Sequence, residues 1–218
     1  MKVIKSIVAA FLMVMIIGNT ALAAEEDSEA KPSARTDDII AVDSTYEFVS
    51  KYGYRYYIAV CKNTSEKDLD VSWDTVSYDE SGSILETGSS YSSYVSPGQN
   101  FILYALFLNS EEAVNYSYKI HYEDSSYMHP AYKDVDFEAS VSKNGSLILQ
   151  ATNTSDSDLS TIQAATLFFD ADGTLIGFED SYIVNSNYNV EAGETVLEDI
   201  RIPEGTDNYI TYYTAYRW

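Results

Sequence analysis

The sequence predicts an all-β protein made of two tandem antiparallel β-sandwich domains behind a signal peptide. The first observation is an internal repeat, in which four landmarks recur in the same order at offsets of 90, 91, 95 and 93 residues. A repeat of this length fits one small β-sandwich and is too long for a solenoid unit. The matching pairs are Asn63-Thr64-Ser65 with Asn153-Thr154-Ser155, Tyr78-Asp79-Glu80-Ser81-Gly82 with Phe169-Asp170-Ala171-Asp172-Gly173, Pro97-Gly98-Gln99 with Ala192-Gly193-Glu194, and Asn115-Tyr116 with Asn208-Tyr209.

The second observation is the strand pattern, because segments rich in β-forming residues alternate with turn residues in both copies. Gly82 and Gly173 suit the left-handed position of a tight turn, and Asn144-Gly145 is a strong hairpin signal. No stretch after the N-terminal segment shows sustained helical periodicity. About six or seven strands per copy predict an immunoglobulin-like sandwich. The clearest predicted strands are residues 56–61, 71–79, 101–108 and 115–123 in the first copy and 147–152, 162–170, 195–202 and 209–218 in the second.

The third observation is the amino terminus, which has the pattern of a cleaved signal peptide over residues 1–23. Lys2 and Lys5 precede an apolar run from Ile7 to Gly18, and Ala21-Leu22-Ala23 is a small-residue cleavage site. The alternative is a transmembrane anchor, but the apolar run is shorter than the roughly 20 residues that a spanning helix needs. We therefore expect a secreted, extracellular or envelope-associated protein that is not inserted in the membrane after cleavage.

Composition divides the rest of the chain. The segment directly after the signal is acidic and contains no aromatic residue, which predicts a disordered spacer. The connector between the copies carries Pro130 and two tyrosines, and it is too apolar for a freely flexible linker. The predicted boundaries are 1–23 for the signal peptide, 24–41 for the spacer, 42–124 for the first domain, 125–134 for the connector and 135–218 for the second domain.

The chain is strongly acidic, with 13 basic and 34 acidic residues and a formal net charge of −21. Removal of residues 1–23 takes away two lysines and no acid, which leaves 11 − 34 = −23. Such a charge repels nucleic acid and anionic lipid, so we expect no nucleic-acid partner. It keeps the protein soluble outside the cell, and it can also attract cations or basic surfaces.

No group of residues has the spacing that catalysis requires, so we expect a protein that is not an enzyme and has no cofactor. The single cysteine, Cys61, stands where the second copy has Ala151, which predicts a small buried core residue. His121 falls on a predicted strand and His129 in the connector, so neither is placed to activate the thiol. No Gly-x-Ser-x-Gly nucleophile motif occurs.

The acidic turn at residues 170–173 raises the question of calcium, which prefers clustered carboxylate oxygens. Its spacing does not match the common calcium loop, which would need an acid where Phe168 stands. The first copy keeps only the first acid and the glycine, as Asp79 and Gly82. An aspartate at the start of a turn more often accepts hydrogen bonds from the backbone two residues on. We therefore expect a structural turn and no metal site, with calcium as the alternative.

Tyrosine is concentrated in the first copy: 14 of the 20 tyrosines lie between Tyr46 and Tyr132, and six lie in the second copy. Exposed tyrosines suit protein or sugar recognition, because the ring offers a large and rigid contact area. The alternative is the ordinary preference of tyrosine for half-exposed strand positions. The first copy is therefore the predicted binding domain. Its candidate binding face consists of Tyr54, Tyr56, Tyr116, Tyr118 and Tyr122.

Both copies contain a strand that ends in Asn-Thr, a long strand that ends in an aromatic residue and Asp, a glycine hairpin and a later glycine turn. The residues are Ile58 to Thr64, Val76-Ser77-Tyr78-Asp79, Gly82 and Pro97-Gly98 in the first copy, and Leu147 to Thr154, Leu167-Phe168-Phe169-Asp170, Gly173 and Gly193 in the second. This order resembles the FxLYD domain of bacterial secreted and envelope proteins. The second copy is closer to the pattern, because the first has Ser77 directly before its Tyr-Asp pair. The resemblance implies an extracytoplasmic β-sandwich with a binding or structural role, and it implies no chemistry.

These observations predict a non-catalytic binding module of the bacterial surface, which contacts an unknown protein or a cell-wall glycan through the tyrosine-rich face. The alternative is a structural or assembly protein in which an edge strand pairs with a partner chain. Loss of binding in a folded Tyr116→Ala or Tyr118→Ala variant would indicate the face. Tolerance of tyrosine loss would indicate strand addition.

Overall fold

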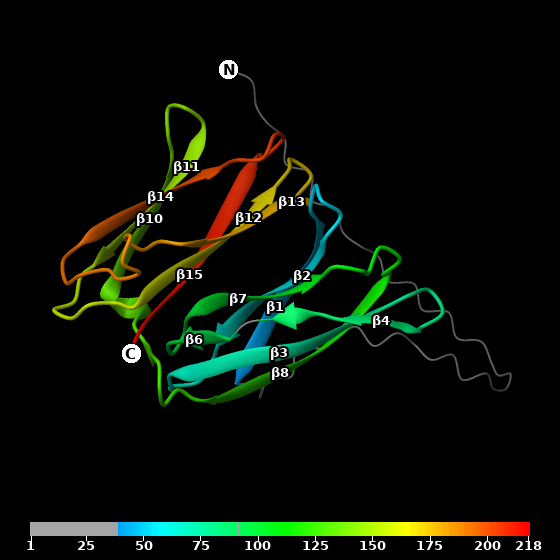
Figure 1. The fold of residues 1–218 in the computed structure, drawn as a ribbon, viewed down its shortest axis with the longest axis horizontal. Coiled ribbons are helices and arrows are strands. Elements are labelled where there is room, and N and C mark those ends of the chain that lie inside the picture. The colour runs from blue at the N-terminus through cyan, green and yellow to red at the C-terminus, as the bar shows by residue number, and fades with distance from the viewer. Residues whose placement is uncertain (1–38, 91) are drawn as a thin grey trace, which may run out of the picture. The chain divides into compact units, whose positions relative to one another are not determined.

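The computed structural model describes residues 39–90 and 92–218, and these residues belong to one compact unit built from antiparallel strands (Figure 1). The described part of the chain has no α-helix and one short 3-10 turn, η1 (Tyr132–Asp134). The predicted all-β class is therefore confirmed. The predicted signal peptide and residues 24–38 of the predicted spacer lie outside the described residues. No helix in the described ranges is long and apolar enough to cross a bilayer.

The strands up to Asp124, here called the N-terminal half, form two sheets. Sheet A has the order β1-β2-β7-β5. Sheet B has the order β4-β3-β6, and β8 pairs with β3 over its whole length. The strands are β1 (Ile40–Val49), β2 (Arg55–Asn63), β3 (Leu69–Tyr78), β4 (Ile84–Thr87), β5 (Ser89–Ser90), β6 (Ser93–Val95), β7 (Asn100–Phe107) and β8 (Asn115–Asp124).

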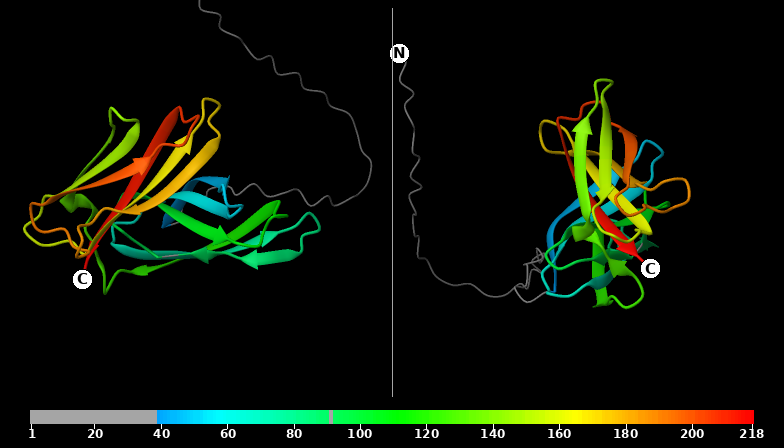
Figure 2. Two further views of the ribbon diagram at one scale, coloured as in Figure 1. Left: turned by 45° about the horizontal axis from the view of Figure 1, so that its top comes forward. Right: turned by 90° about the vertical axis from the view of Figure 1, so that its left-hand side faces the viewer.

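The strands from His129 onward, here called the C-terminal half, form two further sheets, and Figure 2 shows all the strands from two other sides. Sheet C has the order β13-β12-β15-β9, and sheet D has the order β10-β11-β14. The strands are β9 (His129–Pro130), β10 (Val135–Val141), β11 (Ser146–Asn153), β12 (Thr161–Phe169), β13 (Leu175–Tyr182), β14 (Thr195–Arg201) and β15 (Asn208–Arg217).

Each half has a hydrophobic core that receives side chains from both of its sheets. In the N-terminal half, Trp73 of β3 and Phe101 of β7 are fully buried in one cluster. In the C-terminal half, Leu149 of β11 and Ile162 of β12 are buried in the corresponding cluster. Along β3 and β11, buried residues alternate with more accessible ones, because successive side chains of a strand point to opposite faces. Burial of one face of each sheet therefore holds its half together.

The first strand begins slightly earlier than the predicted domain boundary at Val42. Strand β1 starts at Ile40, which the prediction placed in the spacer. The side chain of Ile40 is buried in the core of the N-terminal half, and this burial holds the start of the strand in place. Strand β8 ends at Asp124 and strand β10 begins at Val135. The connector is ordered, since Ala131 is buried and the short β9 pairs with the end of β15.

A third buried cluster joins sheet A to sheet C, and it was not predicted from the sequence. Ile58 of β2 and Ile102 of β7 pack there with Leu167 and Phe169 of β12. These side chains lie on the faces of sheets A and C that point away from the cores of their own halves. Strands β2 and β12 are consequently buried on both faces over much of their length.

Candidate functional site

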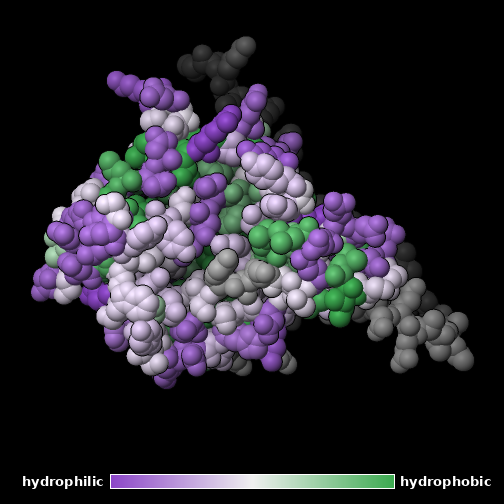
Figure 3. Space-filling model, viewed as in Figure 1, coloured by the Kyte–Doolittle hydropathy of each residue, from purple (hydrophilic) through white to green (hydrophobic). Residues whose placement is uncertain are grey.

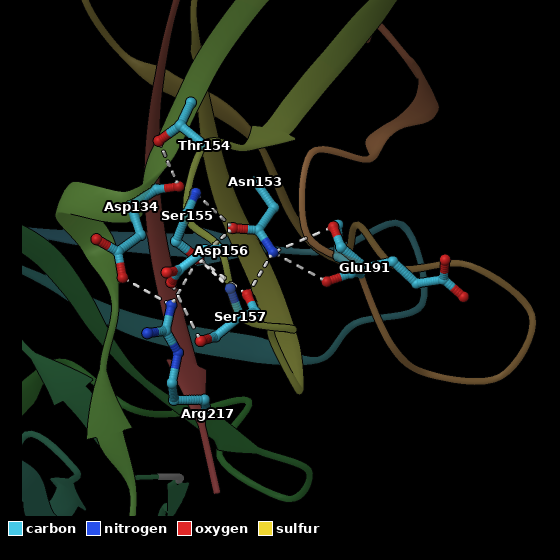
Figure 4. Close-up of polar contacts among 9 residues, drawn as sticks. Asp134, Asn153, Thr154, Ser155, Asp156, Ser157, Glu191 and Arg217 are labelled. Carbon is cyan, nitrogen blue, oxygen red and sulfur yellow. Dashed lines mark hydrogen bonds and ion pairs between the residues drawn. The ribbon is translucent and has the colours of Figure 1, made fainter.

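The repeated asparagines are structural residues that tie three segments together in each half. Asn153 is fully buried, and its Nδ2 donates to the carbonyl oxygens of Ser157, Val190 and Glu191 at 2.9, 3.1 and 3.1 Å (Figure 4). Its Oδ1 accepts hydrogen bonds from the amide and hydroxyl of Ser155. Buried amide groups need such partners, so this side chain holds the turn after β11 against the loop before β14.

Asn63 makes the same contacts in the N-terminal half. Its Nδ2 donates to the carbonyl oxygens of Lys67 and Ser96 at 2.8 and 3.1 Å, and its Oδ1 accepts from the amide and hydroxyl of Ser65. The backbone amide of Gly98 donates to the Asn63 carbonyl, as that of the corresponding glycine does to Asn153. The sequence repeat is therefore also a repeat of hydrogen bonds.

The acidic turns are closed by their first aspartate in both halves. Oδ1 of Asp170 accepts the backbone amides of Asp172 and Thr174 at 3.0 and 2.8 Å. Oδ1 of Asp79 accepts the amides of Ser81 and Ser83 at 2.8 and 2.9 Å. Hydrogen bonds from the Ser81 hydroxyl and then the Ser83 amide lower the pKa of the Asp79 carboxyl. This oxygen is occupied in both turns, as the structural interpretation of the motif predicts.

In the described ranges, no group of three or more histidine, cysteine, aspartate or glutamate side chains is arranged to hold a metal ion. Cys61 is fully buried, and burial raises the pKa of its thiol to about 12. The predicted core position of Cys61 is confirmed, and a thiol with such a pKa is not a nucleophile near neutral pH. His121 lies on β8, exposed, with Nε2 at 2.8 Å from Oδ2 of Asp74.

The five predicted tyrosines do not form one surface. Tyr116 and Tyr118 share one side of β8, as predicted, but that side faces the core of the N-terminal half. The ring of Tyr116 stacks on Tyr57 at a centroid distance of 4.7 Å, and the ring of Tyr118 lies 5.6 Å from Trp73. Burial raises the pKa of both hydroxyls. These two rings are mainly part of the core packing.

The other three predicted tyrosines have different surroundings. Tyr56 points to the cluster between sheets A and C, where its ring lies 5.5 Å from Phe178. Tyr54 and Tyr122 are exposed, at 41% and 48% of their full accessible surface. Tyr54 lies in the turn before β2 and Tyr122 lies near the end of β8. The sequence thus correctly indicated two exposed tyrosines but not a continuous face.

No family model matches this chain, and the search of curated proteins found no match to it. The likeness to the FxLYD domain therefore rests on the residues quoted above. Asn63, Gly82 and Gly98, with their counterparts in the second copy, hold turns. Because the shared residues build the fold, residues that differ between the two copies are the better candidates for a functional role.

The hairpin between β1 and β2 is one such difference. Its turn, residues 50–54, has the same hydrogen bonds as the turn at residues 142–146 between β10 and β11. The amide of Gly53 donates to the carbonyl of Ser50 at 2.9 Å, and the amide of Tyr54 donates to the Ser50 hydroxyl at 3.2 Å. The second turn repeats both bonds at 3.0 and 3.1 Å. Its glycine, Gly145, also has the same φ of 83°.

The two turns differ in the side chains that they display. The first has Tyr52 and Tyr54 where the second has Asn144 and Ser146. The Tyr52 and Tyr54 rings lie 6.3 Å apart at an angle of 42°, and Tyr52 is 72% exposed. Nζ of Lys51 lies 4.9 Å from the centre of the Tyr52 ring. Sequence reasoning missed Tyr52, although a comparison of the two hairpins would have singled it out.

A groove of about 530 Å³ lies beside this hairpin, next to Arg55. One Nη atom of Arg55 donates to the carbonyl of Glu111 at 2.7 Å, which fixes the loop between β7 and β8 near the hairpin. The other four charged residues of the groove are all acidic. The full lining is Arg55, Asp79, Glu80, Ser81, Glu111, Glu112, Ala113 and Val114.

The carboxylate of Asp180 lies beside the cluster between sheets A and C, next to Tyr104 and Gln163. The carboxylate accepts hydrogen bonds from the hydroxyl of Tyr104 at 2.7 Å and from Nε2 of Gln163 at 2.8 and 2.9 Å. Burial raises the pKa of this carboxyl, although both hydrogen bonds act in the opposite direction. Because the pKa of the Asp180 carboxyl is higher in the folded than in the unfolded protein, protonation of this group stabilises the fold. This contribution is complete below the unfolded pKa and is lost as the pH rises through the folded pKa. A cavity of about 30 Å³ beside it has room for water but not for a larger ligand.

Proposed function

We propose that the protein is an exported, non-catalytic binding protein of the bacterial surface. In this proposal the chain consists of two immunoglobulin-like domains of the FxLYD type, cleaved from a signal peptide near Ala23. The N-terminal domain contacts a protein or a cell-wall glycan, and the C-terminal domain supports it. Support for export comes from the pattern of residues 1–23 and from the net charge of −21, which keeps such a chain soluble.

One observation carries the binding function. The residues that the two copies share form turns and buried hydrogen bonds, whereas the first copy adds two exposed tyrosines on a turn that forms equally well without them. Exposed rings on a rigid turn give contact area with little loss of side-chain entropy, which is typical of recognition loops. The proposed binding surface therefore contains Tyr54 of the predicted face together with Tyr52. It leaves out Tyr116 and Tyr118.

The alternative is assembly by strand addition, and β8 is the strand that favours it. Within the described residues this ten-residue strand pairs with β3 on one side and with no strand on the other. A long free edge is a template for an additional strand. However, its exposed side chains include Lys119 and Glu123, and charged side chains on an edge strand discourage edge pairing.

The proposal is tested by co-sedimentation of residues 24–218 with bacterial cell envelopes and, separately, with wall sacculi stripped of protein. Saturable pelleting with sacculi indicates a glycan ligand, and pelleting with envelopes alone indicates a protein partner. Pelleting with neither contradicts a surface-binding function. Hydrogen exchange on the bound protein distinguishes the two modes, because strand addition protects the amides of residues 115–124 and hairpin contact does not.

A further inference from the structure

Four of the seven exposed large apolar side chains described in the N-terminal half lie on the β1–β2 hairpin or directly after β7. Val49 pairs with Arg55, and Arg55 pairs with Phe107, so these strand ends lie side by side. Leu108 follows directly and is 52% exposed, and Val49 is 49% exposed. Tyr52, Tyr54, Val49 and Leu108, which are carried by these neighbouring segments, are here called the hairpin patch. On the face shown in Figure 3, polar residues predominate and apolar ones form small separate groups.

The fold does not require the tyrosines of the hairpin patch. The corresponding turn of the C-terminal half makes the same three backbone and hydroxyl hydrogen bonds with Asn144 and Ser146 in place of Tyr52 and Tyr54. An exposed tyrosine ring gains little for folding, since most of its apolar surface remains in water. The turn of the second copy shows that this hairpin forms without tyrosine. We therefore infer that the rings of Tyr52 and Tyr54 serve contact with another molecule.

Charge around the hairpin patch indicates what kind of molecule this is. The neighbouring groove carries the carboxylates of Asp79, Glu80, Glu111 and Glu112 and a single cation, Arg55. The face of a tyrosine ring attracts lysine and arginine side chains, and carboxylates bind the same groups. The ring of Tyr52 already has a cation from its own chain above it, since Nζ of Lys51 lies at 4.9 Å. The strongly negative chain also attracts basic surfaces at longer range.

We propose that the hairpin patch and the acidic groove beside it bind an arginine- or lysine-rich segment of a protein partner. The inference rests on the proposed binding function and specifies its partner. Basic side chains of the partner lie on the rings of Tyr52 and Tyr54 and reach the carboxylates of Glu111 and Glu112. In the free protein, Lys51 competes with the partner for the ring of Tyr52.

The test measures the affinity of residues 24–218 for a fluorescent peptide of alternating glycine and arginine, by anisotropy at fixed ionic strength. A second peptide with citrulline in place of arginine is neutral and serves as the ligand control. The variant Tyr52→Asn/Tyr54→Ser copies the second hairpin and keeps the net charge. We expect it to weaken arginine-peptide binding roughly five- to tenfold, at about two- to threefold or more per exposed ring. Its unfolding midpoint should equal that of the wild type.

Two further variants sharpen the test. Tyr188→Asn removes another tyrosine, which is 77% exposed at a φ of 58° that asparagine tolerates, and it should leave the affinity unchanged. Lys51→Ala removes the internal competitor and should tighten binding by about twofold. Equal affinity of wild type and Tyr52→Asn/Tyr54→Ser overturns the inference, as does equal affinity for both peptides. If the double variant also pellets with envelopes as the wild type does, the surface-binding function stands and only the hairpin patch is wrong.

Discussion

Replacement of Asn153 by alanine tests whether the repeated asparagines hold the fold. The change removes three donated and two accepted hydrogen bonds from a fully buried site. The carbonyls of Val190 and Glu191 each keep one backbone donor, so their loss is smaller than that of an unpaired group. The amide of Ser155 loses its acceptor. The two hydrogens of Nδ2 are shared among three acceptors, so the change removes the equivalent of about four bonds. At roughly 0.5 to 1 kcal/mol for each, we expect a loss of about 2 to 4 kcal/mol in the free energy of unfolding.

The second copy makes this a replicated experiment. Asn63→Ala removes the equivalent contacts and should cost the same within about 1 kcal/mol, which is the usual spread for one kind of contact. Asn144→Ala, at an exposed turn position, is the matched control and should change stability by less than about 0.5 kcal/mol. Urea unfolding followed by circular dichroism gives the values, with an unchanged slope as the check on comparability. Losses below about 1 kcal/mol for both buried variants would refute the structural role.

Three other predictions concern individual side chains. Tyr116→Ala should lower the unfolding free energy by about 2 to 4 kcal/mol, because the ring is half-buried against the core, and a binding loss without destabilisation would contradict its placement. Burial raises the pKa of the Asp180 carboxyl, so this group should stabilise the fold more as the pH falls from neutral toward 4, and Asp180→Asn should remove that contribution from the urea midpoint; identical pH profiles of wild type and variant would argue against that cause. Cys61 should resist thiol reagents at pH 8 in the folded protein and react after unfolding, because its thiol is buried with a pKa of about 12, and rapid labelling of folded protein would contradict its burial.

The turns could be predicted because their geometry depends on residues close in sequence. Gly82 and Gly173 both adopt a φ of 79°, a conformation that favours glycine, and Asp79 and Asp170 close the same turns. Each turn motif also occurs in both copies, so every turn was predicted from two independent stretches of sequence. Strand positions follow from the same residues, since a strand must fill the distance between two fixed turns.

The contact between sheets A and C was less accessible to sequence reasoning. A signal was present, because residues 56–61 and 164–169 are almost continuously apolar, which is typical of strands buried on both faces. That pattern does not say which surface covers the second face. The partner lies far away in the chain, as with Ile102 and Leu167, so local patterns could not identify it.

The tyrosine-rich face was wrong as a continuous surface for a similar reason. Side-chain alternation correctly placed Tyr116 and Tyr118 on one side of a strand, but alternation alone does not say which side faces water. The intervening Ser117 and Lys119 are polar and exposed, and this was the signal that the rings point inward. Tyr52 was left out of the predicted face because it stands out only when the two hairpins are compared position by position.

The central claim is that shared residues build the fold while the added tyrosines of the β1–β2 hairpin provide binding. It is tested most directly by co-sedimentation of wild-type residues 24–218 and of Tyr52→Asn/Tyr54→Ser with bacterial cell envelopes at equal concentration. We expect saturable pelleting of the wild type and loss of most of it in the variant, with equal unfolding midpoints for the two proteins. Equal pelleting of both would show that the hairpin tyrosines are not the binding element.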